Sequence, residues 1–119
     1  MNDKILIADD ASFMRIMLKD ALREEGYDNI IEAKTGTEAL TMFKMERPKA
    51  VILDVTMPEM DGIETLKQIK NVDPDANVIM CSSMGQEDVV MSCFEAGACD
   101  FVMKPFKPGR VIQAISKIL

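Results

Sequence analysis

Short runs of aliphatic residues alternate along the chain with longer segments in which apolar residues recur every three or four positions. The runs at 4–8, 29–33, 50–53, 77–81 and 101–103 predict buried β-strands, because they are short and bounded by turn-forming residues. Each run is followed by one amphipathic segment, which predicts a helix. Five such units in succession predict an α/β fold: a doubly wound, five-stranded parallel sheet with five helices and right-handed crossovers.

Turn and cap residues set the limits of the predicted helices. Ser12 is expected to cap the first helix and Gly26 to end it, while Thr35 and Glu38 form a capping box for the second. Pro108 suits the first turn of the last helix. The positions expected to face the core are Met14, Met17, Leu18, Ala21, Leu22, Ala39, Leu40, Phe43, Ile63, Leu66, Ile69, Val89, Val90, Cys93, Phe94, Val111, Ile112, Ile115 and Leu119.

Length, composition and charge narrow the classes of function. The 119 residues, 48% hydrophobic and 29% charged, fit one globular domain covering positions 1–119. A net charge of -6 argues against nucleic-acid binding through a basic surface. No apolar run is long enough to span a bilayer, so a cytoplasmic protein without a membrane partner is expected.

The three cysteines show no spacing typical of metal ligands. Cys81, Cys93 and Cys99 are not arranged in close pairs, and the chain has no histidine. A zinc or haem site is therefore not expected. All three are expected to be small buried hydrophobic residues in a reducing compartment.

Carboxylates, a hydroxyl and an amine come directly after four of the predicted strands. Asp9 and Asp10 follow the first strand, Asp54 the third, Ser82 the fourth and Lys104 the fifth. Because all strands of a parallel sheet end at one edge, we expect these groups to converge there. In a sheet of order 2-1-3-4-5 the order reverses between the first and third strands, where open α/β sheets bind their ligands.

This acidic edge predicts phosphoryl chemistry assisted by a metal ion. Clustered carboxylates repel one another unless a cation is present, and an oxygen-rich set without histidine suits Mg²⁺. Mg²⁺, Lys104 and Ser82 would neutralise a phosphoryl group on Asp54, the nucleophile of an acyl-phosphate step. Taken singly, each residue also has a structural interpretation: Asp54 or Ser82 as turn residues, Asp9 and Asp10 as helix caps, Lys104 as a solvated lysine.

In this order, these residues resemble the receiver domain of two-component response regulators, and in particular the family's stand-alone chemotaxis regulators. The resemblance covers essentially the whole chain. It depends on an ordered set of motifs, namely Asp9-Asp10, Asp54, the segment 57–62, the segment 81–86 and Lys104-Pro105-Phe106. It implies a flavodoxin-like sheet of order 2-1-3-4-5.

The resemblance implies a role for each residue of the acidic edge. Asp54 would accept phosphate from the phosphohistidine of a histidine kinase. Mg²⁺ would be bound by Asp10, Asp54 and the main-chain carbonyl of Thr56, and Asp9 would assist through water. Lys104 would contact the phosphoryl oxygens. The chain would be a signalling protein that catalyses its own phosphorylation and dephosphorylation, and not an enzyme in the usual sense.

The resemblance also implies a switch and an output surface. Ser82 and Phe101 would form the switch pair, with the hydroxyl moving to the phosphoryl group and the ring turning inward. The Lys104–Pro105 peptide would be cis. Residues 88–119 would present the output face to a flagellar motor switch protein, with a phosphatase as a possible further partner and a monomer as the expected state.

Two positions of the switch differ from the commonest family pattern. Ser82 stands where Thr is more frequent, which removes a methyl group and keeps the hydroxyl. Phe101 stands where Tyr is common, so a phenolic hydrogen bond is lost and only packing by the ring is left.

Other functions stay open on the sequence alone. The chain could be a phosphorelay intermediate or the receiver of a transcription factor; its end just after the last helix favours a complete protein. An aspartyl-phosphate phosphohydrolase of the haloacid-dehalogenase type would need a second Asp where Thr56 stands, together with a cap domain. A flavodoxin-like redox role is disfavoured because the acidic residues after the first strand would repel a flavin phosphate.

Overall fold

The structure is a computed structural model that describes residues 3–119. The elements along the chain are β1 (Ile5–Ala8), α1 (Ser12–Glu24), β2 (Ile30–Ala33), α2 (Gly36–Glu46), β3 (Ala50–Asp54), α3 (Gly62–Val72), β4 (Val78–Ser82), α4 (Glu87–Glu95), β5 (Asp100–Met103) and α5 (Pro108–Ser116). The predicted alternation of strands and helices is confirmed. Within the described residues, no helix is both long and apolar enough to cross a membrane.

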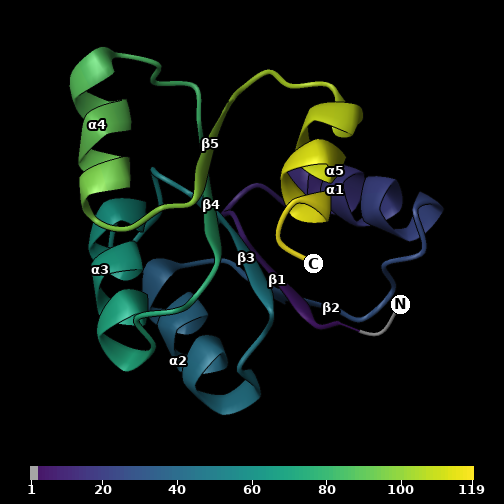
Figure 1. Cartoon of the computed structure of the whole chain (residues 1–119), viewed down its shortest axis with the longest axis horizontal. Helices are drawn as coiled ribbons and strands as arrows, with labels where there is room; N and C mark the ends of the chain where they lie inside the picture. The colour runs from purple at the N-terminus through teal and green to yellow at the C-terminus, as the bar shows by residue number, and fades with distance from the viewer. Residues whose placement is uncertain (1–2) are drawn as a thin grey trace.

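The strands form one parallel sheet in the order β2-β1-β3-β4-β5, as predicted. Helices α1 and α5 lie on one side of the sheet, and α2, α3 and α4 lie on the other (Figure 1). The order reverses between β1 and β3, which are paired directly. The carboxyl ends of these two central strands therefore lie side by side at one edge.

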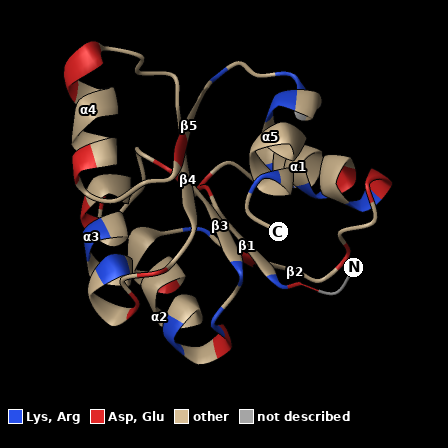
Figure 2. Ribbon diagram, in the orientation of Figure 1, with Lys and Arg blue, Asp and Glu red and all other residues tan. Residues whose placement is uncertain are grey.

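Successive residues of the central strands enter two different cores. Ile5 and Ile7 of β1 pack with residues of α1 and α5, whereas Leu6 and Ala8 pack with residues of α2, α3 and α4. Every residue of β1, β3 and β4 is buried. Charged residues lie mainly on the helices and loops (Figure 2). Burial on both faces explains why these strands are near-continuous apolar runs without alternation.

The predicted N-cap residue is confirmed for α2 and is wrong for α1. The Thr35 hydroxyl accepts a hydrogen bond from the main-chain N–H of Glu38 at 3.0 Å, so the predicted cap of α2 is confirmed. The prediction for Ser12 is wrong, because Ser12 is the first helical residue and Ala11 is the N-cap. The Asp9 carboxylate instead accepts from the N–H of Ala11 at 2.9 Å.

Four side chains predicted to be buried are exposed, and one of them is Met103 at the end of β5, which is 52% exposed. Phe94 of α4 is 47% exposed, because this helix turns Cys93 into the core and the next residue lies about 100° further round the helix. Leu119 lies beyond the end of α5 and is also exposed. Cys99 is exposed in the turn before β5, where its thiol donates to the carbonyl of Val78.

The other two cysteines are buried, as predicted. Cys81 lies in β4 and Cys93 in α4. Burial raises the pKa of the Cys81 thiol to about 12. Cys81 is therefore a neutral thiol at physiological pH and packs as a small hydrophobic residue.

Candidate functional site

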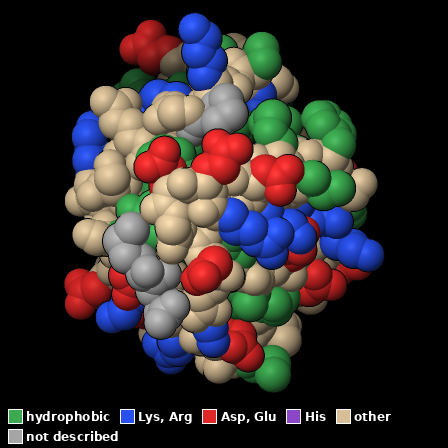
Figure 3. Space-filling model, turned by 90° about the vertical axis from the view of Figure 1, so that its right-hand side faces the viewer, with side chains coloured by type: hydrophobic (Ala, Val, Ile, Leu, Met, Phe, Trp, Pro, Cys, Tyr) green, Lys and Arg blue, Asp and Glu red, His purple; other side chains and the backbone are tan. Residues whose placement is uncertain are grey.

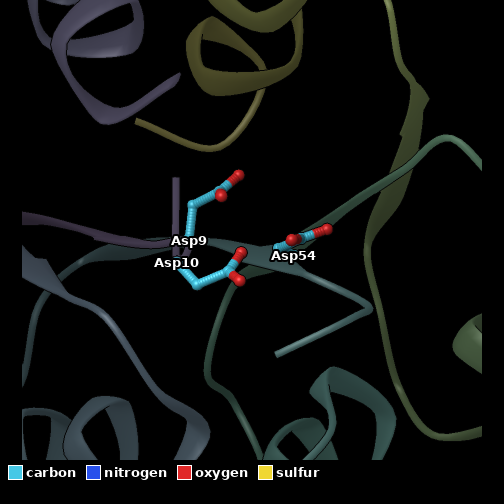
Figure 4. A group of neighbouring side chains, drawn as sticks. All are labelled: Asp9, Asp10 and Asp54. Carbon is cyan, nitrogen blue, oxygen red and sulfur yellow. The ribbon is translucent and has the colours of Figure 1, made fainter. Parts of the chain in front are cut away.

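The carboxylates expected at the sheet edge lie together. Asp9 and Asp10 follow β1 and Asp54 ends β3, directly after Ala8 and Leu53, which are paired across the two strands. One oxygen from each carboxylate lies within 4.8 Å of the other two (Figure 4). Asp9 is 3% exposed and Asp54 7%, whereas Asp10 is open to solvent. The cluster is therefore a shallow acidic site with two of its three carboxylates desolvated.

Lys104 brings a positive charge to this cluster from the end of β5. Its ammonium lies 2.7 Å from Asp9 Oδ2 and 3.4 Å from Asp54 Oδ1. Its main-chain N–H donates to the carbonyl of Ser82 at 2.8 Å, which ties the loop after β5 to the end of β4. The Lys104–Pro105 peptide is cis, as expected. Lys104 is therefore an ion-pair partner of the cluster and not a solvated lysine.

The protonation equilibria of the site reflect its burial and its charge. Burial raises the pKa of the Asp54 carboxyl, and the negative charge of Asp9 raises it further; Lys104 and the N–H of Thr56 offset this only in part. Burial alone would lower the pKa of the Lys104 ammonium. The hydrogen bond to Asp9 and the charges of Asp54 and Asp9 outweigh that effect, so the pKa of Lys104 is raised. One ammonium thus compensates three carboxylates incompletely.

The loop after β3 is held against the site by a close approach of main chains. A Cβ atom at Gly62 would overlap the carbonyl oxygen of Asp54, so only glycine fits there. The Gly62 N–H donates to the carbonyl of Val55 at 2.7 Å. Thr56, in this loop, has its side chain exposed, and its main-chain N–H acts to lower the pKa of Asp54. The Asp61 carboxylate accepts a hydrogen bond from the main-chain N–H of Glu64 at 2.9 Å, which caps the start of α3. Asp61 is therefore a helix cap outside the site.

Ser82 and Phe101, the predicted switch pair, lie in the neighbouring strands β4 and β5. Ser82 is buried as the last residue of β4, and its hydroxyl accepts from the N–H of Met84 at 2.9 Å. Phe101 lies in β5, three residues before Lys104, and its half-buried ring packs on the core beneath α2, α3 and α4. Its carbonyl accepts from Arg110 at 3.2 Å. The Ser82 hydroxyl is the acceptor in its bond to Met84, so its own hydrogen can still be donated to another group.

Arg15 is a residue of this region that the sequence reasoning did not identify. It is 8% exposed, and its guanidinium donates to the main-chain carbonyl of Asp9 at 2.6 Å. The available signal was its position three residues before Leu18 and seven before Leu22, both of which are buried. A search for apolar periodicity passes over a charged residue in that stripe.

The donor set fits a hard divalent cation. The cluster offers oxygen atoms only, two of its carboxylates are desolvated, and a single lysine offsets only part of their charge. Mg²⁺ and similar ions prefer oxygen ligands and retain several waters, which the exposed side at Asp10 can accommodate. Asp9, Asp10 and Asp54 could therefore hold such an ion, and the same edge could receive a phosphoryl group.

The raised pKa of Asp54 predicts that replacing it with Asn stabilises the metal-free protein. Between the unfolded pKa, about 3.8, and the higher folded pKa, the folded state binds more protons, so wild-type stability falls as pH rises. We expect Asp54→Asn to have the higher free energy of unfolding at neutral pH, with the difference shrinking towards about pH 4. Urea unfolding in the presence of a chelator measures this.

The exposed Asp20 provides the control. Asp20→Asn on α1 should change the free energy of unfolding by no more than about 0.5 kcal/mol. An Asp54→Asn protein that is no more stable than wild type at neutral pH would contradict the predicted cost of the buried charge.

Known proteins share both the sequence and the fold of this chain. Residues 5–116 match the response regulator receiver domain family. Over its full length the chain is 50% identical to chemotaxis protein CheY of Bacillus subtilis, and the match covers 99% of that protein. Over 99% of its length it is 48% identical to chemotaxis protein CheY of Thermotoga maritima, and the match covers 98% of that protein. A CheX–CheY–BeF3–Mg²⁺ complex from Borrelia burgdorferi contains a similar chain, with a TM-score of 0.92, 38% identity and coverage of 97% of this chain and 87% of that one.

The parallel sheet of order 2-1-3-4-5, the acidic edge with its lysine and these similarities all agree. The chain belongs to the response regulator receiver domain family of two-component signalling, and it is CheY-like in sequence and fold.

Proposed function

We propose that the protein is a phosphorylation-activated switch, with one receiver domain over residues 1–119, in which Asp54 accepts a phosphoryl group from a histidine kinase. The observation that carries the proposal is the gathering of three carboxylates at the ends of β1 and β3, with the Lys104 ammonium from the end of β5 against two of them, Asp9 and Asp54. Burial of Asp54 removes part of its hydration shell, and Lys104 stands 3.4 Å from its oxygen. Such a carboxylate is suited to a charged acyl-phosphate step.

Mg²⁺ is the proposed cofactor. Asp10, Asp54 and the main-chain carbonyl of Thr56 would hold it, and Asp9 would act through water. The bound ion would supply positive charge opposite the phosphoryl oxygens. The all-oxygen donor set supports this choice, as does the Mg²⁺ named in the complex of the Borrelia burgdorferi relative.

The transfer uses the residues as follows. An oxygen of Asp54 bonds to phosphorus while the bond from phosphorus to the imidazole nitrogen of the kinase breaks, and the imidazole keeps the electron pair. Lys104 stabilises the negative charge on the phosphoryl oxygens. Dephosphorylation is attack by water on the same phosphorus, which releases phosphate and restores the Asp54 carboxylate.

An apolar hollow beside the site is the proposed docking place of the phosphodonor. It has a volume of about 380 Å³ and is lined by Phe13, Met14, Met17, Ser83, Lys104, Pro105 and Phe106. Lys104 thus borders both the hollow and the acidic cluster. Hydrophobic side chains gather on this side of the molecule, which carries α1 and α5 (Figure 3), and Phe13 and Ile16 are 68% and 54% exposed. A kinase domain seated there would reach Asp54.

Phosphorylation would act on a partner surface through Ser82 and Phe101. The added group brings about -1.5 to -2 charge to Asp54, which draws the Ser82 hydroxyl towards it and biases the position of the Phe101 ring. The output face of residues 88–119 carries exposed Met91, Phe94 and Met103. The proposed partner there is the flagellar motor switch protein. The protein would act as a cytoplasmic monomer, and a phosphatase would shorten the signal.

The test is phosphorylation followed by partner capture. The protein is incubated with a small acyl-phosphate donor, with Mg²⁺ or with a chelator, and intact mass is measured. We expect a mass increment of one phosphate that requires Mg²⁺. The phosphorylated and unphosphorylated forms are then compared for affinity to an N-terminal peptide of a motor switch protein.

Each outcome bears on a different part of the proposal. No phosphate increment in the presence of Mg²⁺ contradicts the switch itself. An increment with equal peptide affinity in both states leaves a receiver but contradicts the motor assignment, and it favours a phosphorelay intermediate or the receiver of a transcription factor. A phosphohydrolase is disfavoured because Thr56 stands where such an enzyme needs its second Asp.

A further inference from the structure

Arg15 lies buried in α1, where a charged side chain needs a specific reason. Its Nη1 donates to the carbonyl oxygen of Asp9 at 2.6 Å, and its Nε donates to Glu32 Oε1 at 3.0 Å. Lys19, one turn further along α1, donates to the other oxygen of Glu32 at 2.8 Å. The guanidinium therefore links β2 to the main chain at the end of β1, and Lys19 steadies the carboxylate that holds it.

Both polar groups of the Asp9 main chain, its N–H and its carbonyl, make hydrogen bonds. Its N–H donates to the carbonyl of Ala33 at 3.1 Å, and its carbonyl accepts from Arg15. That carbonyl belongs to the planar peptide unit leading to Asp10, so fixing it restricts the directions in which the Asp9 and Asp10 side chains leave the chain. The Asp9 carboxylate is also held by the N–H of Ala11 at 2.9 Å and by Lys104 at 2.7 Å.

We propose that Arg15 is a positioning residue for the acidic cluster: through the Asp9 carbonyl it holds the Asp9 and Asp10 carboxylates in the arrangement that binds a divalent cation with Asp54. This inference rests on the proposed Mg²⁺ function of the cluster. Within the described part of the chain, the Arg15 guanidinium donates to Glu32 and to a main-chain carbonyl, and to none of the three carboxylates of the cluster. Its effect is therefore exerted through the main chain.

The sign of the effect separates positioning from simple electrostatics. Removing a positive charge next to three carboxylates makes the site more negative, which by charge alone strengthens the binding of a divalent cation. Losing a residue that orients the metal ligands without touching the metal weakens metal binding, typically by 10- to 100-fold. A decrease in Mg²⁺ affinity after removal of Arg15 can therefore not come from its charge.

The experiment measures the Mg²⁺ dissociation constant of the unphosphorylated protein by calorimetry. We expect Arg15→Met to weaken Mg²⁺ binding by about tenfold or more. The matched control is Arg23→Met, which removes the same charge from an exposed position of the same helix and should leave the affinity close to that of wild type. Unchanged or tighter Mg²⁺ binding by Arg15→Met overturns the inference.

Arg15→Lys is the second variant and covers the case in which Arg15→Met fails to fold. It keeps the charge, but one ammonium cannot reproduce the two-directional fork that joins the Asp9 carbonyl to Glu32. We expect its Mg²⁺ binding to be weakened as well. Full wild-type affinity in Arg15→Lys overturns the positioning role.

A second readout separates this inference from the proposed function. The Ala11 amide, bonded to the Asp9 carboxylate, should exchange its hydrogen faster in both Arg15 variants than in Arg23→Met, without any metal present. If wild type does not bind Mg²⁺, the proposed cofactor fails, and the Ala11 exchange rate alone decides whether Arg15 orders Asp9. Unchanged exchange at Ala11 overturns the inference in either case.

Discussion

Asp54→Asn is expected to abolish phosphorylation by a small acyl-phosphate donor. The amide is a far weaker nucleophile than the carboxylate and cannot form the mixed anhydride, while Lys104 keeps its contact with Asp9 at 2.7 Å. The rest of the site should therefore stay folded, so the loss is one of chemistry. Intact-mass measurement with Mg²⁺ and excess donor checks this, and we expect no phosphate increment where wild type gains one.

The control for this variant is a nearby carboxylate with a structural role. Asp61 caps α3, and Asn is as good a cap residue as Asp, so Asp61→Asn should be phosphorylated like wild type. A phosphate increment that persists in Asp54→Asn would mean that another residue accepts the phosphoryl group, and the proposed acceptor would be wrong.

Lys104→Met is expected to show the second-largest effect, a fall of about 100- to 1000-fold in the rate of phosphorylation. The Lys104 ammonium forms ion pairs with both Asp9 and Asp54. Its removal therefore leaves the phosphoryl oxygens without this positive charge during the transfer. Mg²⁺ should bind at least as tightly as in wild type, because a competing cation is gone. Stopped-flow or quenched time courses at saturating Mg²⁺ measure the rate.

Lys107 provides the matched comparison. It lies in the same loop, three residues later, and is exposed, so Lys107→Met should keep a rate close to wild type. Equal rates for the two lysine variants would show that Lys104 serves only to balance charge in the resting protein. Weaker Mg²⁺ binding by Lys104→Met would instead indicate that the loop had lost its position.

The sequence predicts the fold well because its strands are buried on both faces. Near-continuous apolar runs such as those of β1, β3 and β4, each followed by an amphipathic segment, have few alternatives to a parallel sheet. The same geometry brings Asp9, Asp54 and Lys104 together, because each comes at or just after a strand end. This part of the site follows from topology and needs no knowledge of side-chain contacts.

The features that the sequence does not predict depend on tertiary contacts. Arg15 can be buried because its guanidinium donates hydrogen bonds to Glu32 of β2 and to the main-chain carbonyl of Asp9. Ser12 looks like a cap, but the turn brings the Asp9 carboxylate to the helix start. The present partner of the Ser82 hydroxyl, the N–H of Met84, likewise depends on a loop conformation that residue types do not specify.

The two charged partners of the pocket, Asp9 and Lys104, are 95 positions apart in the chain. A nascent polypeptide that has not yet emerged beyond β4, or a proteolytic fragment that has lost β5 and the residues after it, carries Asp9 and Asp54 without the lysine that pairs with them. The ion pairs that Lys104 makes with Asp9 and Asp54 therefore form only after the last strand has docked, so an incompletely synthesised or cleaved molecule keeps its buried carboxylates without that compensating charge.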